Sequence, residues 1–176
     1  MIPLKRSTLW VAAAVATAVL LQAGWILLAS HSVLPAYEID GYLDRARRLM
    51  GTGGWIAALS QSGSDVLRPP LYPIFLMLGL RAGMRPSELL YLQVGLAAWE
   101  VVAMYWLALN VAGRRSAIIA AFVAACWPPW ILASATFAGE HLDLPLVTTA
   151  LALTVSAYRR TDRSWSRTVH VLTEKT

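Results

Sequence analysis

An uncharged apolar run from Leu9 to Ser30 constrains this chain more than any other feature of its sequence. A helix needs about 20 such residues to cross the hydrocarbon core of a bilayer. The run exceeds the apolar region of a signal peptide, which has about 7–15 residues, and further long apolar segments follow it. We therefore predict that residues 9–30 form a first transmembrane helix.

The composition supports this prediction. Of the 176 residues, 57% are apolar and 14% are charged, whereas soluble domains have about 45–50% apolar residues and about a quarter charged. The net charge of +5 does not indicate nucleic acid, because the basic residues flank apolar segments instead of lining one face. The expected partner is membrane lipid. Cys126 is the single cysteine, and we expect it to be a small buried hydrophobic residue.

Further apolar segments define the predicted fold class, which is an all-α, polytopic membrane protein with about four transmembrane helices. The other three spans are predicted at residues 89–112, 116–138 and 142–158. The apolar segment 71–84 would extend only about 21 Å as a helix, short of the roughly 30 Å core, so it is predicted to be interfacial or re-entrant. The paired prolines Pro128 and Pro129 are expected to kink or end the third span.

The polar segments complete the domain organisation. Residues 31–86 form a predicted external loop that contains a juxtamembrane amphipathic helix with one shared apolar face, made of Leu43, Ala46, Leu49 and Met50. Residues 1–158 make up the transmembrane region, and residues 159–176 are predicted to be a polar cytoplasmic tail without regular structure.

Basic pairs at the ends of the predicted spans indicate the orientation in the membrane. The three pairs are Lys5-Arg6, Arg114-Arg115 and Arg159-Arg160. Positive residues close to span ends favour the cytoplasmic side, and all three pairs lie on one side if segment 71–84 does not cross. The prediction is a multi-pass protein of a bacterial inner (plasma) membrane, with a cytoplasmic N-terminus.

Four residues on the opposite side are candidates for chemistry: Glu38, Asp40, Arg68 and Glu140. A carboxylate can take a proton from an acceptor hydroxyl, and arginine can hold a phosphate through a bidentate fork. A second carboxylate can bind a divalent cation that neutralises phosphate charge. These residue types at a membrane surface suit transfer from a lipid-linked phosphate.

Each candidate also has a structural interpretation. Asp40 can cap the amphipathic helix, Arg68 can bind lipid headgroups, and Glu140 can be an interfacial loop carboxylate. His141 is interpreted as a solvated turn residue. Glu100 lies inside a predicted span, where a carboxylate is costly and is a functional hypothesis by default.

The order of motifs resembles the N-terminal part of GT-C-type membrane glycosyltransferases, in the group of protein O-mannosyltransferases and aminoarabinose transferases. The resemblance covers roughly residues 8–158 and is carried by Glu38-Ile39-Asp40-Gly41-Tyr42, Arg68-Pro69-Pro70-Leu71-Tyr72-Pro73, Gly113-Arg114-Arg115, Pro128 and Glu140. It implies transfer of a sugar from a polyprenyl phosphate to an acceptor outside the cytoplasm.

The resemblance also implies roles for individual residues. The catalytic first-loop aspartate of the family matches the pair of Glu38 and Asp40: residue type favours Asp40, and the spacing from Tyr42 favours Glu38. Arg68 matches the residue that contacts the donor phosphate. Glu140 matches an acidic residue associated with a metal, here Mg²⁺ or Mn²⁺, or with phosphate.

Family members continue through more helices, so this chain is expected to be a fragment or one piece of a split protein that needs the remaining transmembrane helices.

Two functions other than sugar transfer stay open from the sequence. The alternative is a non-catalytic integral membrane subunit or remnant that needs partner helices. A third hypothesis is a small transporter that uses Glu100 as a proton or cation site.

Overall fold

The computed structural model describes residues 6–31, 41–51 and 70–173, and side chains in residues 7–30, 41–51 and 70–161. Within these ranges every regular element is a helix, which confirms the all-α prediction for this part of the chain. The helices are α1 (Arg6–His31), α2 (Tyr42–Gly51), α4 (Leu71–Arg81), α5 (Pro86–Ala112), α6 (Arg114–Ala125), α7 (Pro128–Ala133) and α8 (Glu140–Thr173).

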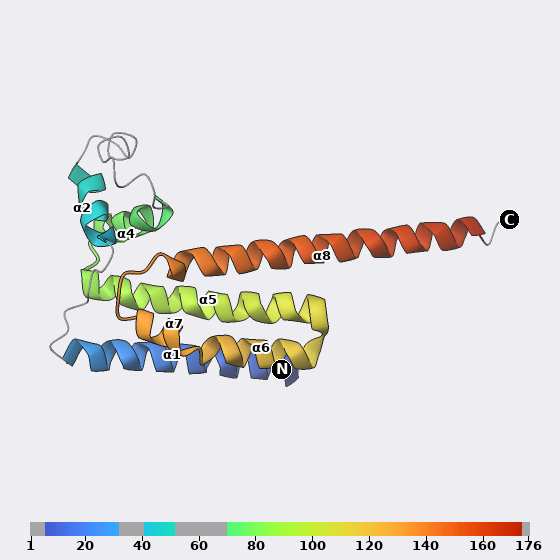
Figure 1. Cartoon of the computed structure of the whole chain (residues 1–176), viewed down its shortest axis with the longest axis horizontal. Coiled ribbons are helices and arrows are strands. Elements are labelled where there is room, and N and C mark those ends of the chain that lie inside the picture. The colour runs from blue at the N-terminus through green and yellow to red at the C-terminus, as the bar shows by residue number, and fades with distance from the viewer. Residues whose placement is uncertain (1–5, 32–40, 52–69, 174–176) are drawn as a thin grey trace, which may run out of the picture.

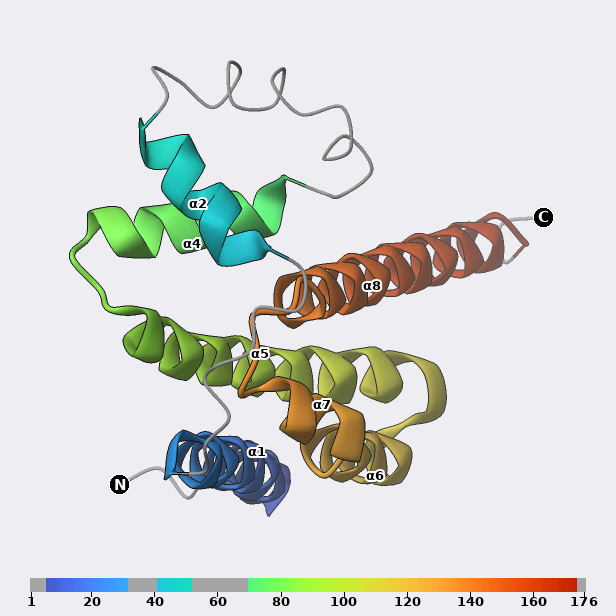
Figure 2. The ribbon, with the colours of Figure 1, turned by 60° about the vertical axis from the view of Figure 1, so that its left-hand side comes forward.

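Helix α5 is the centre of a bundle of long helices. It packs against α1, α6 and α8, and α1 also packs against α6 and α7. Figures 1 and 2 show that α1 and α6 run antiparallel to α5, whereas α8 runs parallel to it. The chain returns from the far end of α5 through α6 and α7 before α8 begins, so α8 starts beside the first half of α5.

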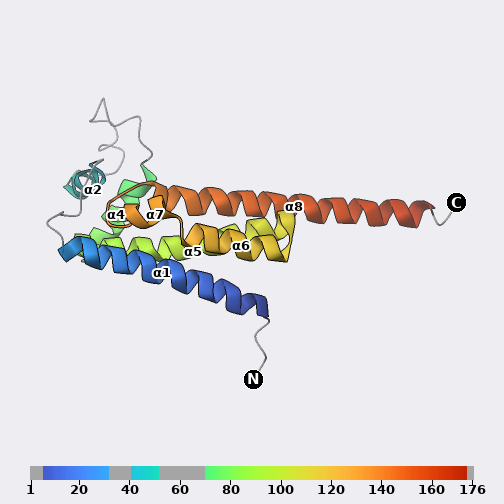
Figure 3. The ribbon, with the colours of Figure 1, turned by 60° about the horizontal axis from the view of Figure 1, so that its bottom comes forward.

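The bundle has two different ends. At the end where α1 finishes and α5 and α8 begin, α2 and α4 pack against each other, and we call this the capped end (Figures 1 and 2). At the opposite end α5 turns into α6 through Gly113, whose φ of 85° is a conformation that favours glycine. Figure 3 shows the start of α1 at this opposite end and α8 extending beyond it.

Two helices in the described ranges are long and apolar enough to cross a membrane, at Ser7–Ser30 and Pro86–Ala112. Only 22% and 28% of their most apolar windows are buried inside the protein, whereas the core helix of a soluble protein is mostly buried. Leu20 is 72% exposed and Leu28 is 68% exposed. The exposed surface of α1 is therefore strongly apolar, as a lipid-facing surface would be.

The segment predicted as one span at residues 116–138 is divided into two helices. Helix α6 ends at Ala125, and α7 restarts at Pro128. A proline excludes the residue before it from helical geometry, and Trp127 has an extended ψ of 111°. Pro128 and Pro129 then occupy the first turn of α7, where a missing N–H costs nothing. The predicted break is confirmed.

Segment 71–84 forms the short helix α4, whose 11 residues extend only about 16 Å. The tail predicted to lack regular structure is different: α8 continues as one helix to Thr173. The reason is visible in the sequence, because no glycine or proline follows Pro145 to stop the helix. The absence of apolar periodicity therefore did not prevent helix formation there.

The predicted amphipathic helix is α2, and most of its expected apolar face is buried. Its buried apolar side chains include Leu43, Ala46 and Leu49. Met50 is 43% exposed and was wrongly assigned to that face. Cys126 was also predicted to be buried, but it is exposed. It follows the last residue of α6, where the helix ends before the double proline.

Candidate functional site

Three segments that are far apart in sequence meet at the capped end. Tyr42 at the start of α2 and Tyr72 in α4 contact each other edge to face, with ring centroids 5.0 Å apart. Gly139 lies immediately before α8. A Cβ added to it would lie 3.1 Å from the Tyr42 hydroxyl oxygen, so that a larger residue would require Tyr42 to shift. Helices α2 and α4 and the residue that precedes α8 therefore meet here.

A hydrogen-bond relay fixes Tyr72 in this arrangement. Its hydroxyl donates to the Gln93 side-chain oxygen on α5, and the Gln93 amide nitrogen donates to the Thr136 carbonyl, 3.1 Å away. Burial raises the pKa of Tyr72; a hydrogen bond from the Ala138 backbone acts in the opposite direction, and Tyr42 and the Glu140 carboxylate add smaller upward contributions. Tyr72 therefore remains a protonated phenol that can donate to Gln93. The relay joins α4, α5 and the connection before α8.

The four predicted site residues fall into two groups. Glu38, Asp40 and Arg68 lie outside the described residues. Glu140 is the first residue of α8, and it is exposed at the capped end. Its neighbour Gly139 is the residue against which the Tyr42 hydroxyl lies.

The described residues closest to the other three lie at this same junction. Tyr42 follows Asp40 by two residues. Pro70, two residues after Arg68, precedes α4 and the buried ring of Tyr72. The flanks of all the predicted site segments therefore come together, whereas the juxtaposition of the candidate side chains themselves stays a prediction.

Asp143 is an acidic residue at this end that the sequence analysis missed. It shares the first turn of α8 with Glu140, and residues three apart lie on one face of a helix. The positive end of the helix dipole favours negative charge in this turn. The spacing in Glu140-His141-Leu142-Asp143 was the available signal, but Asp143 was absorbed into the predicted span at residues 142–158.

Within the described ranges, no group of three or more His, Cys, Asp or Glu side chains could hold a metal ion. The divalent cation expected at Glu140 therefore stays a prediction. A pair of carboxylates from one helical turn can supply only part of the oxygen shell that Mg²⁺ or Mn²⁺ takes up.

His141 is not the solvated turn residue that the sequence suggested. Its side chain is fully buried, and its ring lies against Trp130 with centroids 4.7 Å apart. Burial lowers the pKa of His141, while the Ala133 carbonyl and the Glu140 carboxylate act in the opposite direction. Neither ring nitrogen forms a hydrogen bond of normal geometry with the described residues. The imidazole is therefore held neutral.

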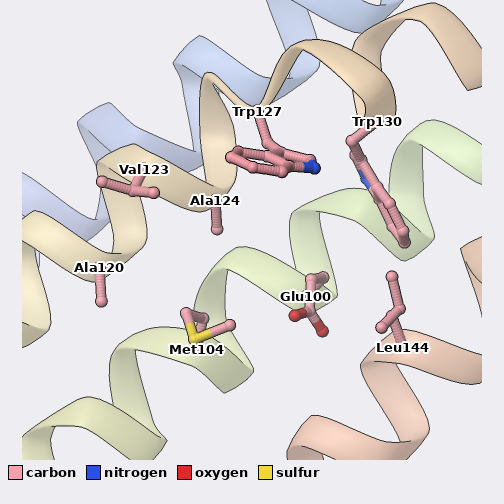
Figure 4. A pocket seen from close by; sticks show the side chains of 8 residues that line it. All are labelled: Glu100, Met104, Ala120, Val123, Ala124, Trp127, Trp130 and Leu144. Atoms are coloured by element: carbon pink, nitrogen blue, oxygen red, sulfur yellow. The ribbon is translucent and has the colours of Figure 1, made fainter.

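A separate cavity of about 290 Å³ lies between α5, α6, α7 and α8, around the carboxylate of Glu100 (Figure 4). Glu100 is 8% exposed, and Thr148 on α8 donates a hydrogen bond to it, with 3.0 Å between Oγ1 and Oε1. The other residues that line the cavity are Met104, Ala120, Val123, Ala124, Trp127, Trp130 and Leu144. Glu100 is the only ionisable residue among them.

Comparison with known proteins gives no relative from which a function could be transferred. No protein-family model, curated protein or solved structure matches the chain. Function is therefore argued from the geometry of the capped end, the Glu100 cavity and the order of motifs in the sequence.

Proposed function

We propose that this chain is a multi-pass membrane protein whose capped end contributes to a glycosyltransferase that uses a polyprenyl-phosphate sugar. The observation that carries the proposal is the meeting of Tyr42, Tyr72 and Gly139. These residues lie beside the segments that contain Asp40, Arg68 and Glu140, the residues proposed for catalysis, donor binding and metal or phosphate binding. A site assembled from distant segments needs this kind of junction.

The chemistry proposed for the capped end has three parts. Asp40 or Glu38 takes the proton of the acceptor hydroxyl as that oxygen attacks the anomeric carbon of the sugar. Arg68 holds the phosphate that leaves with the lipid, which carries the developing negative charge. Glu140 and Asp143 offer two carboxylates at one helix start, where a divalent cation could add to the neutralisation of that charge.

The charge distribution at the other end supports a membrane orientation. Arg114 and Arg115 are exposed at the start of α6, and Arg159 on α8 donates a hydrogen bond to the Val111 carbonyl near the end of α5, over 3.3 Å. Arginine at the end of a helix offsets the unpaired carbonyls there. We propose that this end, where α1 begins, is cytoplasmic and that the capped end faces outward.

A transfer assay with a radiolabelled polyprenyl-phosphate sugar tests the proposal. The assay uses membranes that contain the chain together with whatever partner helices make an active assembly. Asp40→Asn should abolish transfer, and Glu38→Gln should matter less if Asp40 is the base. Arg68→Ala should raise the KM for the lipid donor most. Asp44→Asn is the matched control, because Asp44 is exposed and its carboxylate lies 3.2 Å from Arg47 on the same helix.

The pattern of effects decides between two functions. Full transfer in the double variant Asp40→Asn, Glu38→Gln would show that no first-loop carboxylate acts as the base. The second candidate is a non-catalytic membrane subunit, and the exposed apolar faces of α6 and α8 favour it, with Ile119 64% and Leu153 55% exposed. Such faces suit partner helices as well as lipid. Stable assemblies with partner helices but without transfer activity would support this candidate.

A further inference from the structure

The Glu100 cavity is built around a carboxylate whose hydrogen bonding is incomplete. Oε1 of Glu100 accepts from Thr148, whereas Oε2 is buried and has no hydrogen-bond partner among the described residues. A buried carboxylate oxygen without a donor is costly, and more so in the middle of an apolar helix. Figure 4 shows the carboxylate among the lining side chains, with open space beside it.

The cavity exists because of the local sequence on α6 and α7. Ala120 and Ala124 lie one turn apart and present only methyl groups to the cavity. Helix α6 then ends, and the double proline starts α7 one residue after Trp127. This break places two indole rings beside the cavity, with Trp130 buried and Trp127 54% exposed. Small residues therefore make the space, and the break provides the aromatic walls.

The lining selects a class of ligand. A carboxylate in apolar surroundings favours a cation, and the faces of indole rings attract cations as well. Mg²⁺ and Ca²⁺ are disfavoured, because each requires about six or more oxygens and the cavity offers one carboxylate and one hydroxyl. The other lining residues are apolar and suit a hydrocarbon body. About 290 Å³ is at the small end of ligand pockets.

We propose that the Glu100 cavity binds a protonated lipophilic amine, with its N–H donated to the carboxylate of Glu100 and its ammonium group beside Trp127 and Trp130. The hydrocarbon body lies against Met104, Val123 and Leu144. This inference does not rest on the proposed transferase activity, since Glu100 lies on α5 away from the junction of Tyr42, Tyr72 and Gly139. It assigns a function to the one ionisable residue that lines this cavity.

Direct binding tests the proposal on the full chain in lipid nanodiscs. The probe is radiolabelled N,N-dimethyloctylamine, and empty nanodiscs report its partition into lipid. Retention above this background should be saturable and should fall about tenfold in affinity in Glu100→Gln, the loss of one charge-assisted contact. The glutamine still accepts from Thr148, so the helix packing is preserved. Glu88→Gln, an exposed carboxylate on the same helix, should bind like the wild type.

Chemical protection gives a second readout. Dicyclohexylcarbodiimide is an apolar reagent that modifies carboxyl groups in apolar surroundings, and mass spectrometry locates the adduct. N,N-dimethyloctylamine should protect Glu100 at concentrations at which n-octanol and octanoate do not. Trp127→Leu should leave the labelling of Glu100 intact and weaken protection by the amine, because it removes a cation–π contact but keeps an apolar wall.

Three results would overturn the proposal. Equal protection by n-octanol would make the cavity an ordinary apolar space. Equal retention of the amine by the wild type and Glu100→Gln would remove the role of the carboxylate. Labelling that occurs in nanodiscs but is blocked in native membranes would show that a partner helix, and not a small amine, covers Glu100.

Discussion

The Tyr42 hydroxyl lies so close to Gly139 that a Cβ at position 139 would be 3.1 Å from its oxygen and 3.5 Å from Cζ. Tyr42 is itself held by the ring of Tyr72, so it cannot move away without disturbing the packing of α2 against α4. Gly139→Ala should therefore separate α2 from the start of α8 and cost about 1–3 kcal/mol of stability. Thermal unfolding in detergent measures the change.

Gly95 provides the control for this substitution. A Cβ at Gly95 meets nothing within 4 Å, and the residue lies inside α5, where alanine is favoured over glycine by about 0.5–1 kcal/mol. Gly95→Ala should leave the unfolding temperature unchanged or raise it. An equal loss of stability in both variants would show that the Tyr42–Gly139 contact is not special.

Tyr72→Phe tests the relay that joins α4 to α5. The substitution keeps the ring but removes the donor to Gln93, which leaves a buried amide oxygen unsatisfied and should cost about 1–3 kcal/mol. In a double-mutant cycle with Gln93→Leu the two losses should not add, because the second substitution removes the orphaned oxygen. Tyr91→Phe is the matched control, since Tyr91 lies on α5, the helix of Gln93, and is 42% exposed. Additive losses would contradict the relay.

His141 makes stability depend on pH. Burial lowers its pKa in the folded protein, so below the ordinary value of about 6.5 the unfolded chain binds a proton that the folded chain does not. The stability that neutral, buried His141 contributes is therefore complete above about pH 6.5, and it is lost as the pH falls toward the lowered pKa of His141. Chemical unfolding between pH 7.5 and pH 5 should show this decline.

His141→Phe is the variant that isolates this effect. Phenylalanine fills the space beside Trp130 without a titratable group, so the decline in stability with falling pH should become shallower. The variant should also be at least as stable as the wild type near pH 7, because a buried polar ring without normal hydrogen bonds is replaced by an apolar one. An unchanged pH profile would show that other groups carry the dependence.

The sequence predicted the architecture better than it predicted the surroundings of single residues. The long apolar runs at residues 9–30 and 89–112 correspond to α1 and α5, because length and apolar character act over the whole helix. The break before Pro128 was also predictable, since proline acts on the residue next to it. Both properties are local, and neither depends on how the helices pack.

The residues that were missed depend on contacts across the fold. His141 in a polar turn gave no sign that Trp130 would cover it, and Asp143 looked like part of a span. Cys126 sits in an apolar run but lies at a helix end, where its side chain is exposed. For the candidate site, only the location of Glu140 at the capped end follows from the described residues; Glu38, Asp40 and Arg68 lie outside them.

Labelling of two engineered cysteines tests the proposed orientation. Ser87 lies in the first turn of α5 at the capped end, Ser116 lies in the first turn of α6 at the opposite end, and both are exposed. In a background in which Cys126 is replaced by alanine, a membrane-impermeant maleimide added to intact cells should label Ser87→Cys. It should label Ser116→Cys only after the membrane is opened, because the Arg114-Arg115 pair is expected to be cytoplasmic.

The geometry of α5 makes this test decisive. If α5 crosses the bilayer, residues 87 and 116 must lie on opposite sides, because they stand at the two ends of α5, which has 27 residues and extends about 40 Å at 1.5 Å per residue. Labelling of both positions from outside would mean that α5 does not cross and would remove the basis for a multi-pass protein. The reversed pattern would keep the spans but place the capped end in the cytoplasm, where an acceptor outside the cell could not reach Glu140.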